Sequence, residues 1–181
     1  MKIESLDDEY WINRIPSDSS AFEVIYDRYL PKVSRYIHRK VSDQMATEDL
    51  TSQVFFNALD GILNGRYASR NKFAAWIFSI ARTKIADYYR EKQAVSLEDL
   101  HQEIGSDDHR GFEFEGNDAL ANCFSDLSQY EQDLLALRFS AELDFSTIAL
   151  ILHKNSAAIK MATYRALRNI RKKMEGYHDQ E

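Results

Sequence analysis

Apolar side chains recur every three or four residues along most of the chain, the spacing that places them on one face of an α-helix. In the first half this pattern predicts three helices, over about 20–37, 46–63 and 71–92. The short segment 6–15 contains a Tyr-Trp-Ile run and is a candidate for a further helix that packs on these three. The pattern therefore predicts that the first half forms a small helical bundle.

Local signals mark the ends of these helices. Ser20-x-x-Glu23 matches a capping box and predicts the start of the first helix. Pro31 predicts a kink or bend within it. Gly65 follows the second helix as a C-cap. Trp76 shares a face with apolar residues of the third helix, and we interpret it as part of the core.

The second half predicts a helix-turn-helix. Ser128-x-x-Glu131 is a second capping box that opens one helix. A short helix over about 145–152 is followed by the three residues 153–155, of which Asn155 is a good N-cap. A longer helix then runs over about 156–175. A short helix, a three-residue turn and a longer basic helix make up the helix-turn-helix pattern.

The segment between the two halves has a different composition. Three of the chain's six glycines lie in 93–117, which also carries seven acidic residues against one basic residue and shows no sustained periodicity. We predict an all-α fold with two small helical domains, 1–92 and 118–181, joined by a flexible acidic linker at 93–117. No stretch of useful length alternates as a strand would.

Charge is unevenly distributed along the chain. The formal net charge is −6, which argues against coating nucleic acid by bulk charge. Residues 153–173 nevertheless hold seven basic residues and no acidic one. At 100° per residue, the small and apolar positions of the last helix separate from a basic face that includes Lys160 and Arg165. A recognition helix in the DNA major groove needs this division, whereas a surface helix with solvated charges is the alternative.

A second basic segment contains aromatic side chains. A Tyr-Tyr pair near the end of the third helix lies among four basic residues, Arg82, Lys84, Arg90 and Lys92. Cations that hold phosphates beside rings that stack on bases suit single-stranded nucleic acid. An ordinary amphipathic helix with solvated charges is the alternative interpretation. Because the total charge is negative, we expect the free chain to bind DNA weakly.

Nothing in the sequence indicates catalysis or metal binding. The five histidines are scattered, and no phosphate-binding loop, dinucleotide fingerprint or nucleophile elbow is present. We therefore expect no catalytic residue, no cofactor and no metal site. The single cysteine, Cys123, is interpreted as a buried, inert thiol in a reducing compartment. No signal peptide or membrane-spanning stretch is recognisable, so we expect a cytoplasmic protein without membrane insertion.

Three segments in order resemble extracytoplasmic-function (ECF) sigma factors. Residues 47–55, TEDLTSQVF, resemble the family's AEDLVQEVF segment, and residues 73–82, FAAWIFSIAR, resemble FRAWLFRIAR. Residues 148–167, IALILHKNSAAIKMATYRAL, resemble the helix-turn-helix IAEILGISVGTVKSRLHRAL. The resemblance covers nearly the whole chain outside 93–117. It implies that 1–92 is sigma region two and that 118–181 is sigma region four.

The resemblance also implies which residues meet each partner. The positions matching the contact with the clamp helices of the largest RNA polymerase subunit are Asp49, Ser52 and Gln53. Those matching the reading and opening of the promoter −10 element are Arg82, Thr83, Lys84, Asp87, Tyr88 and Arg90. Those matching or facing the −35 element are Lys160, Met161, Tyr164, Arg165 and Arg168.

The function implied is that of a promoter-specificity subunit of bacterial RNA polymerase, which is not itself an enzyme. Its partners would be core polymerase, promoter DNA and an anti-sigma factor. Two alternatives stay open from the sequence. One is a sigma-like decoy or regulator that binds a protein partner. The other is a helix-turn-helix transcription regulator without polymerase docking.

Overall fold

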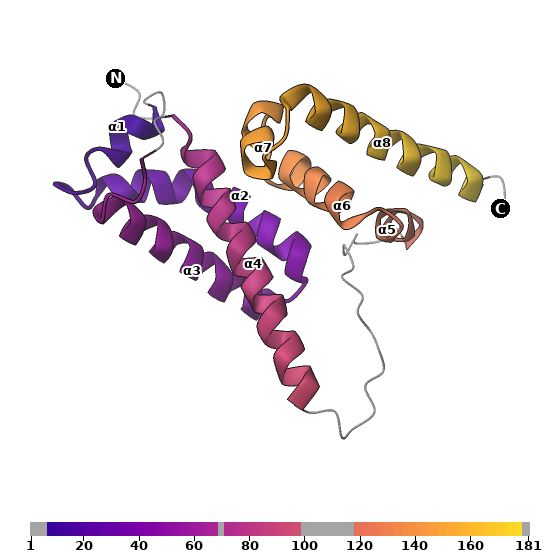
Figure 1. The fold of residues 1–181 in the computed structure, drawn as a ribbon, viewed down its shortest axis with the longest axis horizontal. Helices are drawn as coiled ribbons and strands as arrows, with labels where there is room; N and C mark the ends of the chain where they lie inside the picture. The colour runs from indigo at the N-terminus through magenta and orange to yellow at the C-terminus, as the bar shows by residue number, and fades with distance from the viewer. Residues whose placement is uncertain (1–6, 69–70, 99–117, 179–181) are drawn as a thin grey trace.

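The computed structural model describes residues 7–68, 71–98 and 118–178. Within these ranges the chain is all-α, with helices and no strand, which confirms the predicted fold class. Figure 1 shows the helices in two groups, α1 to α4 and α5 to α8, lying side by side.

The first group is a bundle built around α2 (Ala21–Val41), α3 (Gln44–Leu63) and α4 (Phe73–Glu98). The three helices pack pairwise on one another, and the short α1 (Asp8–Ile12) packs on α2. The buried side chains fall on the predicted apolar stripes. They include Ile25, Val33, Ile37, Val54, Ala58, Ile77 and Ala81, whereas the buried Phe78 lies outside the predicted stripe.

Two of the helix-end predictions have different outcomes. Ser20 does not cap α2, because its hydroxyl donates to the Asp18 carboxylate at 2.6 Å and its own backbone is already helical. The prediction of a Ser20–Glu23 capping box was therefore wrong. Gly65 follows α3 with φ of +67° and donates its N–H to the carbonyl of Ile62 at 3.1 Å. Its prediction as a C-cap glycine is confirmed. The helix α2 runs on through Pro31.

The second group contains α5 (Asp118–Ser125), α6 (Gln129–Leu135), η2 (Ala136–Ser140), α7 (Phe145–Leu152) and α8 (Ser156–His178). The Ser128–Glu131 capping box is present in full and opens α6. The π-helical turn η2, which continues α6, was not predicted. Cys123 is buried in this group, as expected.

The helix-turn-helix forms as predicted. His153 ends α7 in the left-handed region, at φ of 52°. Asn155 then caps α8 by accepting the N–H of Ala157 at 2.8 Å. The short turn is therefore fixed at one end by the left-handed backbone of His153 and at the other by the side chain of Asn155.

The segment expected as a linker is partly helical. The helix α4 ends at Glu98, six residues beyond the predicted boundary at 92. The residues 93–98 therefore extend α4 and are not linker. The rest of the predicted segment, 99–117, lies outside the described residues.

The two groups also pack against each other. The helix α2 lies on η2, and α4 lies on α7. Buried apolar side chains of both groups belong to one core cluster, which includes Tyr36 and Phe78 of the first group and Leu137 and Ile151 of the second. The sequence predicted two joined domains and gave no indication of this shared core.

Gly61 permits a close approach between α3 and Trp76 of α4. A β-carbon at this position would lie 2.7 Å from the Trp76 ring. We expect Gly61→Ala to lower the free energy of unfolding by about 1–2 kcal/mol, because overpacking outweighs the helix propensity gained. Thermal unfolding of Gly61→Ala, Trp76→Phe and the double variant gives the coupling between the two sites. Additive losses would contradict the close contact.

Candidate nucleic-acid and polymerase interfaces

The predicted polymerase contact lies on the outer face of α3. Asp49 and Ser52 are exposed and Gln53 is half-buried. The Gln53 amide donates to the Asp49 carboxylate at 2.8 Å, one helical turn apart. The Ser52 hydroxyl donates to the carbonyl of Glu48. The three side chains therefore form one polar surface directed away from the core.

Two apolar side chains share this surface of α3. Met45 is 82% exposed and Phe56 is 70% exposed. With Asp49 and Ser52 they follow the i, i+4, i+7, i+11 spacing of a single helical face. Sequence reasoning missed both. The Phe55-Phe56 pair could have indicated Phe56. Neighbouring residues on a helix point about 100° apart, so only one of the two rings can face the core.

The predicted −10 residues do not form a single face of α4. They are Arg82, Thr83, Lys84, Asp87, Tyr88 and Arg90. Thr83, Asp87 and Arg90 lie within about 60° of one another around the helix axis, and Arg90 donates to Asp87 at 2.8 Å. Lys84 and Tyr88 lie further around the helix, half-buried. Lys92 stands 5.9 Å from the centre of the Tyr88 ring, so a cation and an aromatic side chain do meet here.

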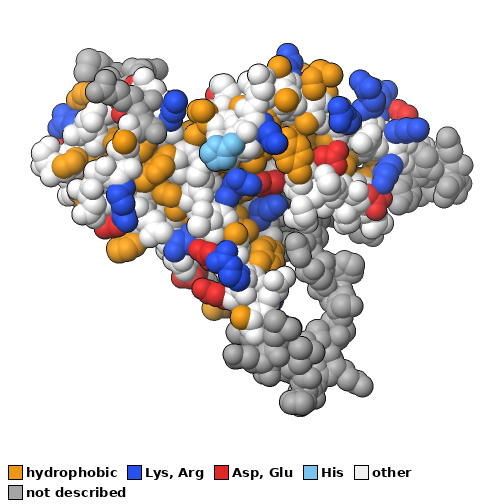
Figure 2. All heavy atoms as spheres, viewed as in Figure 1, with side chains coloured by type: hydrophobic (Ala, Val, Ile, Leu, Met, Phe, Trp, Pro, Cys, Tyr) orange, Lys and Arg blue, Asp and Glu red, His pale blue; other side chains and the backbone are white. Residues whose placement is uncertain are grey.

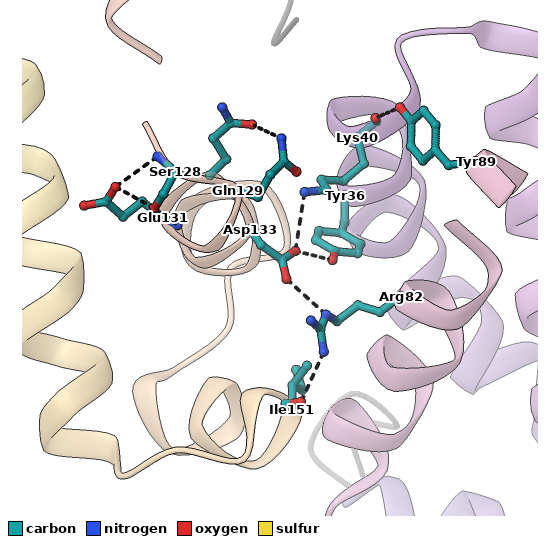
Figure 3. Close-up of polar contacts among 10 residues, drawn as sticks. Tyr36, Lys40, Arg82, Tyr89, Ser128, Gln129, Glu131, Asp133 and Ile151 are labelled. Atoms are coloured by element: carbon teal, nitrogen blue, oxygen red, sulfur yellow. Dashed lines mark hydrogen bonds and ion pairs between the residues drawn. The ribbon is translucent and has the colours of Figure 1, made fainter. Parts of the chain in front are cut away.

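Arg82 points instead toward the second group of helices (Figure 3). Its Nε donates to the Asp133 carboxylate of α6 at 3.0 Å, and a terminal nitrogen donates to the carbonyl of Ile151 at 3.3 Å. Both bonds tie α4 to the helices that carry the helix-turn-helix. The sequence predicted that Arg82 contacts DNA, but in this structure Arg82 forms hydrogen bonds within the chain.

Asp133 also contacts two side chains of α2, one by a hydrogen bond and one as an ion pair. The Tyr36 hydroxyl donates to it at 2.6 Å, and the Lys40 ammonium lies 3.8 Å from the same oxygen. Burial and the neighbouring Asp133 carboxylate raise the pKa of the Tyr36 hydroxyl well above its usual range, so Tyr36 stays a neutral donor.

The predicted −35 residues lie on the exposed face of α8. Lys160, Met161, Tyr164, Arg165 and Arg168 are all exposed. On the opposite face, Ile159, Thr163 and Ala166 are buried against the rest of the second group. Figure 2 shows Lys and Arg side chains gathered along this helix. The division between an apolar inner face and a cationic outer face is therefore present in the folded chain.

Asp144 fixes the start of α7, the first helix of the helix-turn-helix. It accepts the N–H of Thr147 at 2.7 Å and the hydroxyl of Ser146 at 2.5 Å. Partial burial alone would raise the pKa of this carboxyl. The hydrogen bonds from Ser146 and Thr147 outweigh that effect and lower the pKa below the ordinary 3.8.

Removing this cap is expected to destabilise the chain. Asp144→Ala should cost about 1 kcal/mol at neutral pH, whereas Asp144→Asn should keep most of the cap. Because the folded-state pKa is lowered, the charge-dependent part of the stability is present above about 3.8 and is lost as the pH falls through the lower folded value. Urea unfolding from pH 7 to pH 3 measures this. If Asp144→Asn and Asp144→Ala lose the same free energy of unfolding, Asp144 does not stabilise the chain as a helix cap.

No metal centre or membrane span stands out in what the structure describes. Among residues 7–68, 71–98 and 118–178, no group of His, Cys, Asp and Glu side chains could hold a metal ion. None of the helices over those same ranges is long and apolar enough to cross a membrane.

The chain is similar to known sigma factors. The sigma-70 region 2 family model matches residues 25–95. The ECF RNA polymerase sigma factor BldN of Streptomyces coelicolor is 33% identical over 159 residues. These likenesses support an ECF-type RNA polymerase sigma factor. The aligned part covers 84% of this chain and 60% of BldN, so the chain spans less than two thirds of that relative's length.

Two solved structures share the fold of this chain. CnrH, in complex with the cytosolic domain of CnrY, has a TM-score of 0.66 at 16% identity and covers 93% of this chain and 97% of CnrH. RpoE from Bartonella quintana, in complex with the anti-sigma factor NepR, has a TM-score of 0.62 at 18% identity, with coverage of 85% and 96%. At these identities the likeness concerns the fold alone.

Proposed function

We propose that this chain is a promoter-specificity subunit that binds core RNA polymerase and recognises and opens promoter DNA. The observation that carries the proposal is the exposed cationic face of α8, opposite a buried apolar face in a complete helix-turn-helix. In the same chain, the region 2 match spans the helix α3 and most of α4, on which the other two predicted surfaces lie.

The division of labour follows the three surfaces. Asp49, Ser52 and Gln53 of α3 contact the clamp helices of the largest polymerase subunit. The −10 element is read and opened by residues of α4, namely Arg82, Thr83, Lys84, Asp87, Tyr88 and Arg90. Lys160, Met161, Tyr164, Arg165 and Arg168 of α8 contact the −35 element. In this proposal residues up to 98 form the region two domain, and 118–181 form the region four domain.

Opening a duplex requires bases to be unstacked, at a few kcal/mol for each flipped base. Cations and rings on α4 offset part of this cost by holding phosphates and stacking on the freed bases. The chain acts as a polymerase subunit in the cytoplasm and is not itself an enzyme. An anti-sigma factor is a further proposed partner, supported by the fold shared with RpoE, whose structure contains the anti-sigma factor NepR.

Run-off transcription tests the proposal. Core polymerase is mixed with a library of promoter fragments, with and without the protein, and the transcripts are sequenced. We expect discrete start sites that require the protein, and co-purification of the protein with core polymerase. Core binding without initiation would favour the decoy. DNA binding without core binding would favour a helix-turn-helix regulator.

A further inference from the structure

The outer face of α8 changes in chemistry along the length of the helix. Over the first two turns the exposed side chains are small or apolar with a single cation, namely Ala157, Ala158, Lys160, Met161 and Tyr164. Over the next two turns the exposed side chains include four cations, Arg165, Arg168, Arg171 and Lys172. Figure 2 shows hydrophobic side chains near the start of α8 and Lys and Arg side chains further along it. The two parts of the helix therefore offer different chemistry to one ligand.

The apolar part forms a single patch on the outside of the helix. Met161 is 64% exposed and Tyr164 is 50% exposed. At 100° per residue, Ala157, Met161 and Tyr164 lie within about 60° of one another around the axis of α8. An exposed apolar patch bordered by polar side chains is typical of a binding surface.

The surroundings of this patch favour DNA as its partner. Lys160, Arg165 and Arg168 border it, and residues 153–173 contain no acidic residue. Cations in such numbers attract the phosphates of a duplex. In a helix-turn-helix, the N-terminal part of the second helix meets the edges of the bases in the major groove. The apolar patch occupies that part of α8, so it would face base edges.

The side chains of the first two turns restrict which bases they can read. In the major groove, cytosine is read by carboxylates and adenine by carboxamides. Between Ala157 and Tyr164, no exposed residue carries either group. Lys160 suits guanine, because its O6 and N7 both accept hydrogen bonds. Apolar side chains suit thymine, whose 5-methyl group is the apolar feature of a base edge in this groove.

The ring of Tyr164 is positioned by its neighbours for such a contact. Its centre lies 6.4 Å from the centre of the Phe145 ring at the start of α7. The Arg138 guanidinium in turn lies 4.8 Å from the centre of the Phe145 ring. These contacts limit the rotation of Tyr164, so less conformational entropy is lost when the ring meets a base.

We propose that Ala157, Met161 and Tyr164 select A·T base pairs of the −35 element through the 5-methyl group of thymine, while Lys160 selects guanine beside them. The inference rests on the proposed function, because it takes α8 as the −35 surface, and it adds which group of the DNA this helix reads. Arg165 and Arg168 strengthen binding through phosphates, which carry no direct information on the sequence.

Replacing thymine with deoxyuridine tests the inference, because uracil pairs as thymine does and lacks only the 5-methyl group. The complex of this chain with core polymerase first selects duplexes from a random-sequence library. The element that a Lys160→Ala, Arg165→Ala double variant no longer enriches is the −35 element. The selected duplex is then made with deoxyuridine at the thymines of that element alone. A −35 element without A·T pairs would overturn the inference at this step.

Loss of the methyl groups should weaken binding measurably. We expect the affinity of the complex to fall about fourfold for each methyl group in contact, since burial of one group of that size changes binding by about that factor. Electrophoretic mobility shifts of the thymine and deoxyuridine duplexes measure the fall. Equal affinity for the two duplexes would overturn the inference.

Met161→Ala and Arg168→Ala form a matched pair on the same face of α8. Both residues are exposed, and far-UV circular dichroism checks that each variant keeps its helix content. Met161→Ala should reduce the preference for thymine over deoxyuridine by about fourfold. Arg168→Ala should weaken binding to both duplexes by the same factor and leave the preference unchanged, because it removes a phosphate contact. An equal preference in the two variants would contradict the assignment of Met161 to thymine.

The inference and the proposed function fail in different ways. If the complex initiates at discrete sites but does not distinguish thymine from deoxyuridine, the proposed function stands and the reading of methyl groups is wrong. If the chain neither binds core polymerase nor supports initiation, the proposed function is wrong, and the selection is repeated with the full chain alone at low salt. A preference for thymine in the selected duplex would then still support methyl reading by α8. Selection of no sequence, or of one without that preference, would overturn it.

Discussion

Alanine at both Lys160 and Arg165 is expected to weaken binding of the polymerase–sigma complex to −35 promoter DNA by about 30-fold or more. Each contact of a basic side chain with DNA contributes about 1–3 kcal/mol, and both residues lie on the exposed face of α8. The salt dependence of binding should also become shallower, because fewer counterions are released. Electrophoretic mobility shifts over a range of salt concentrations measure both effects.

A control with the same loss of charge is available on the same helix. Arg171 pairs with Glu175 and Lys173 pairs with Asp126, so both contribute to ion pairs within the chain. Arg171→Ala with Lys173→Ala should therefore weaken DNA binding much less. Binding of core polymerase should be unchanged in both double variants. Loss of core binding in the Lys160/Arg165 variant would contradict the assignment of α8 to DNA.

Reversing the charge at Asp49 is expected to weaken binding to core polymerase by about 100-fold. Asp49 is exposed on α3 and oriented by the Gln53 amide, so Asp49→Lys places a cation where the proposed partner surface meets a carboxylate. Like charges brought together at an interface cost several kcal/mol. Surface plasmon resonance with immobilised core polymerase measures the loss.

Asp27→Lys is the matched control, since it makes the same change at an exposed carboxylate on α2. It should leave core affinity within about twofold, as expected for a surface charge outside the interface. Equal losses in the two variants would mean that the total charge of the chain, and not the α3 surface, governs docking.

The sequence predicted most of the fold because its signals are local. The spacing of apolar residues placed the long helices, and Asn155 and the Ser128–Glu131 pair marked two helix starts correctly. Local signals also caused the error at Ser20, where a nearby Asp18 carboxylate competes for the hydroxyl. The extension of α4 to Glu98 was missed because acidic composition was taken as a sign of linker.

The candidate surfaces were predictable only in part. Periodicity on α8 separated the residues now seen as exposed from those that are buried. No pattern could place Arg82 beside Asp133, because the contact joins residues 51 positions apart from different groups of helices. Phe56 was missed for another reason: an exposed aromatic residue beside a buried one leaves the helical stripe intact.

The position of Asp133 late in the chain has a consequence during translation. Tyr36 and Asp133 are 97 residues apart, and domains generally fold as units while the chain is still being synthesised. The helices α1 to α4 are thus synthesised before Asp133, which bonds two of them, has been made. In that interval Arg82 and Tyr36 lack the carboxylate that they bond in the finished protein.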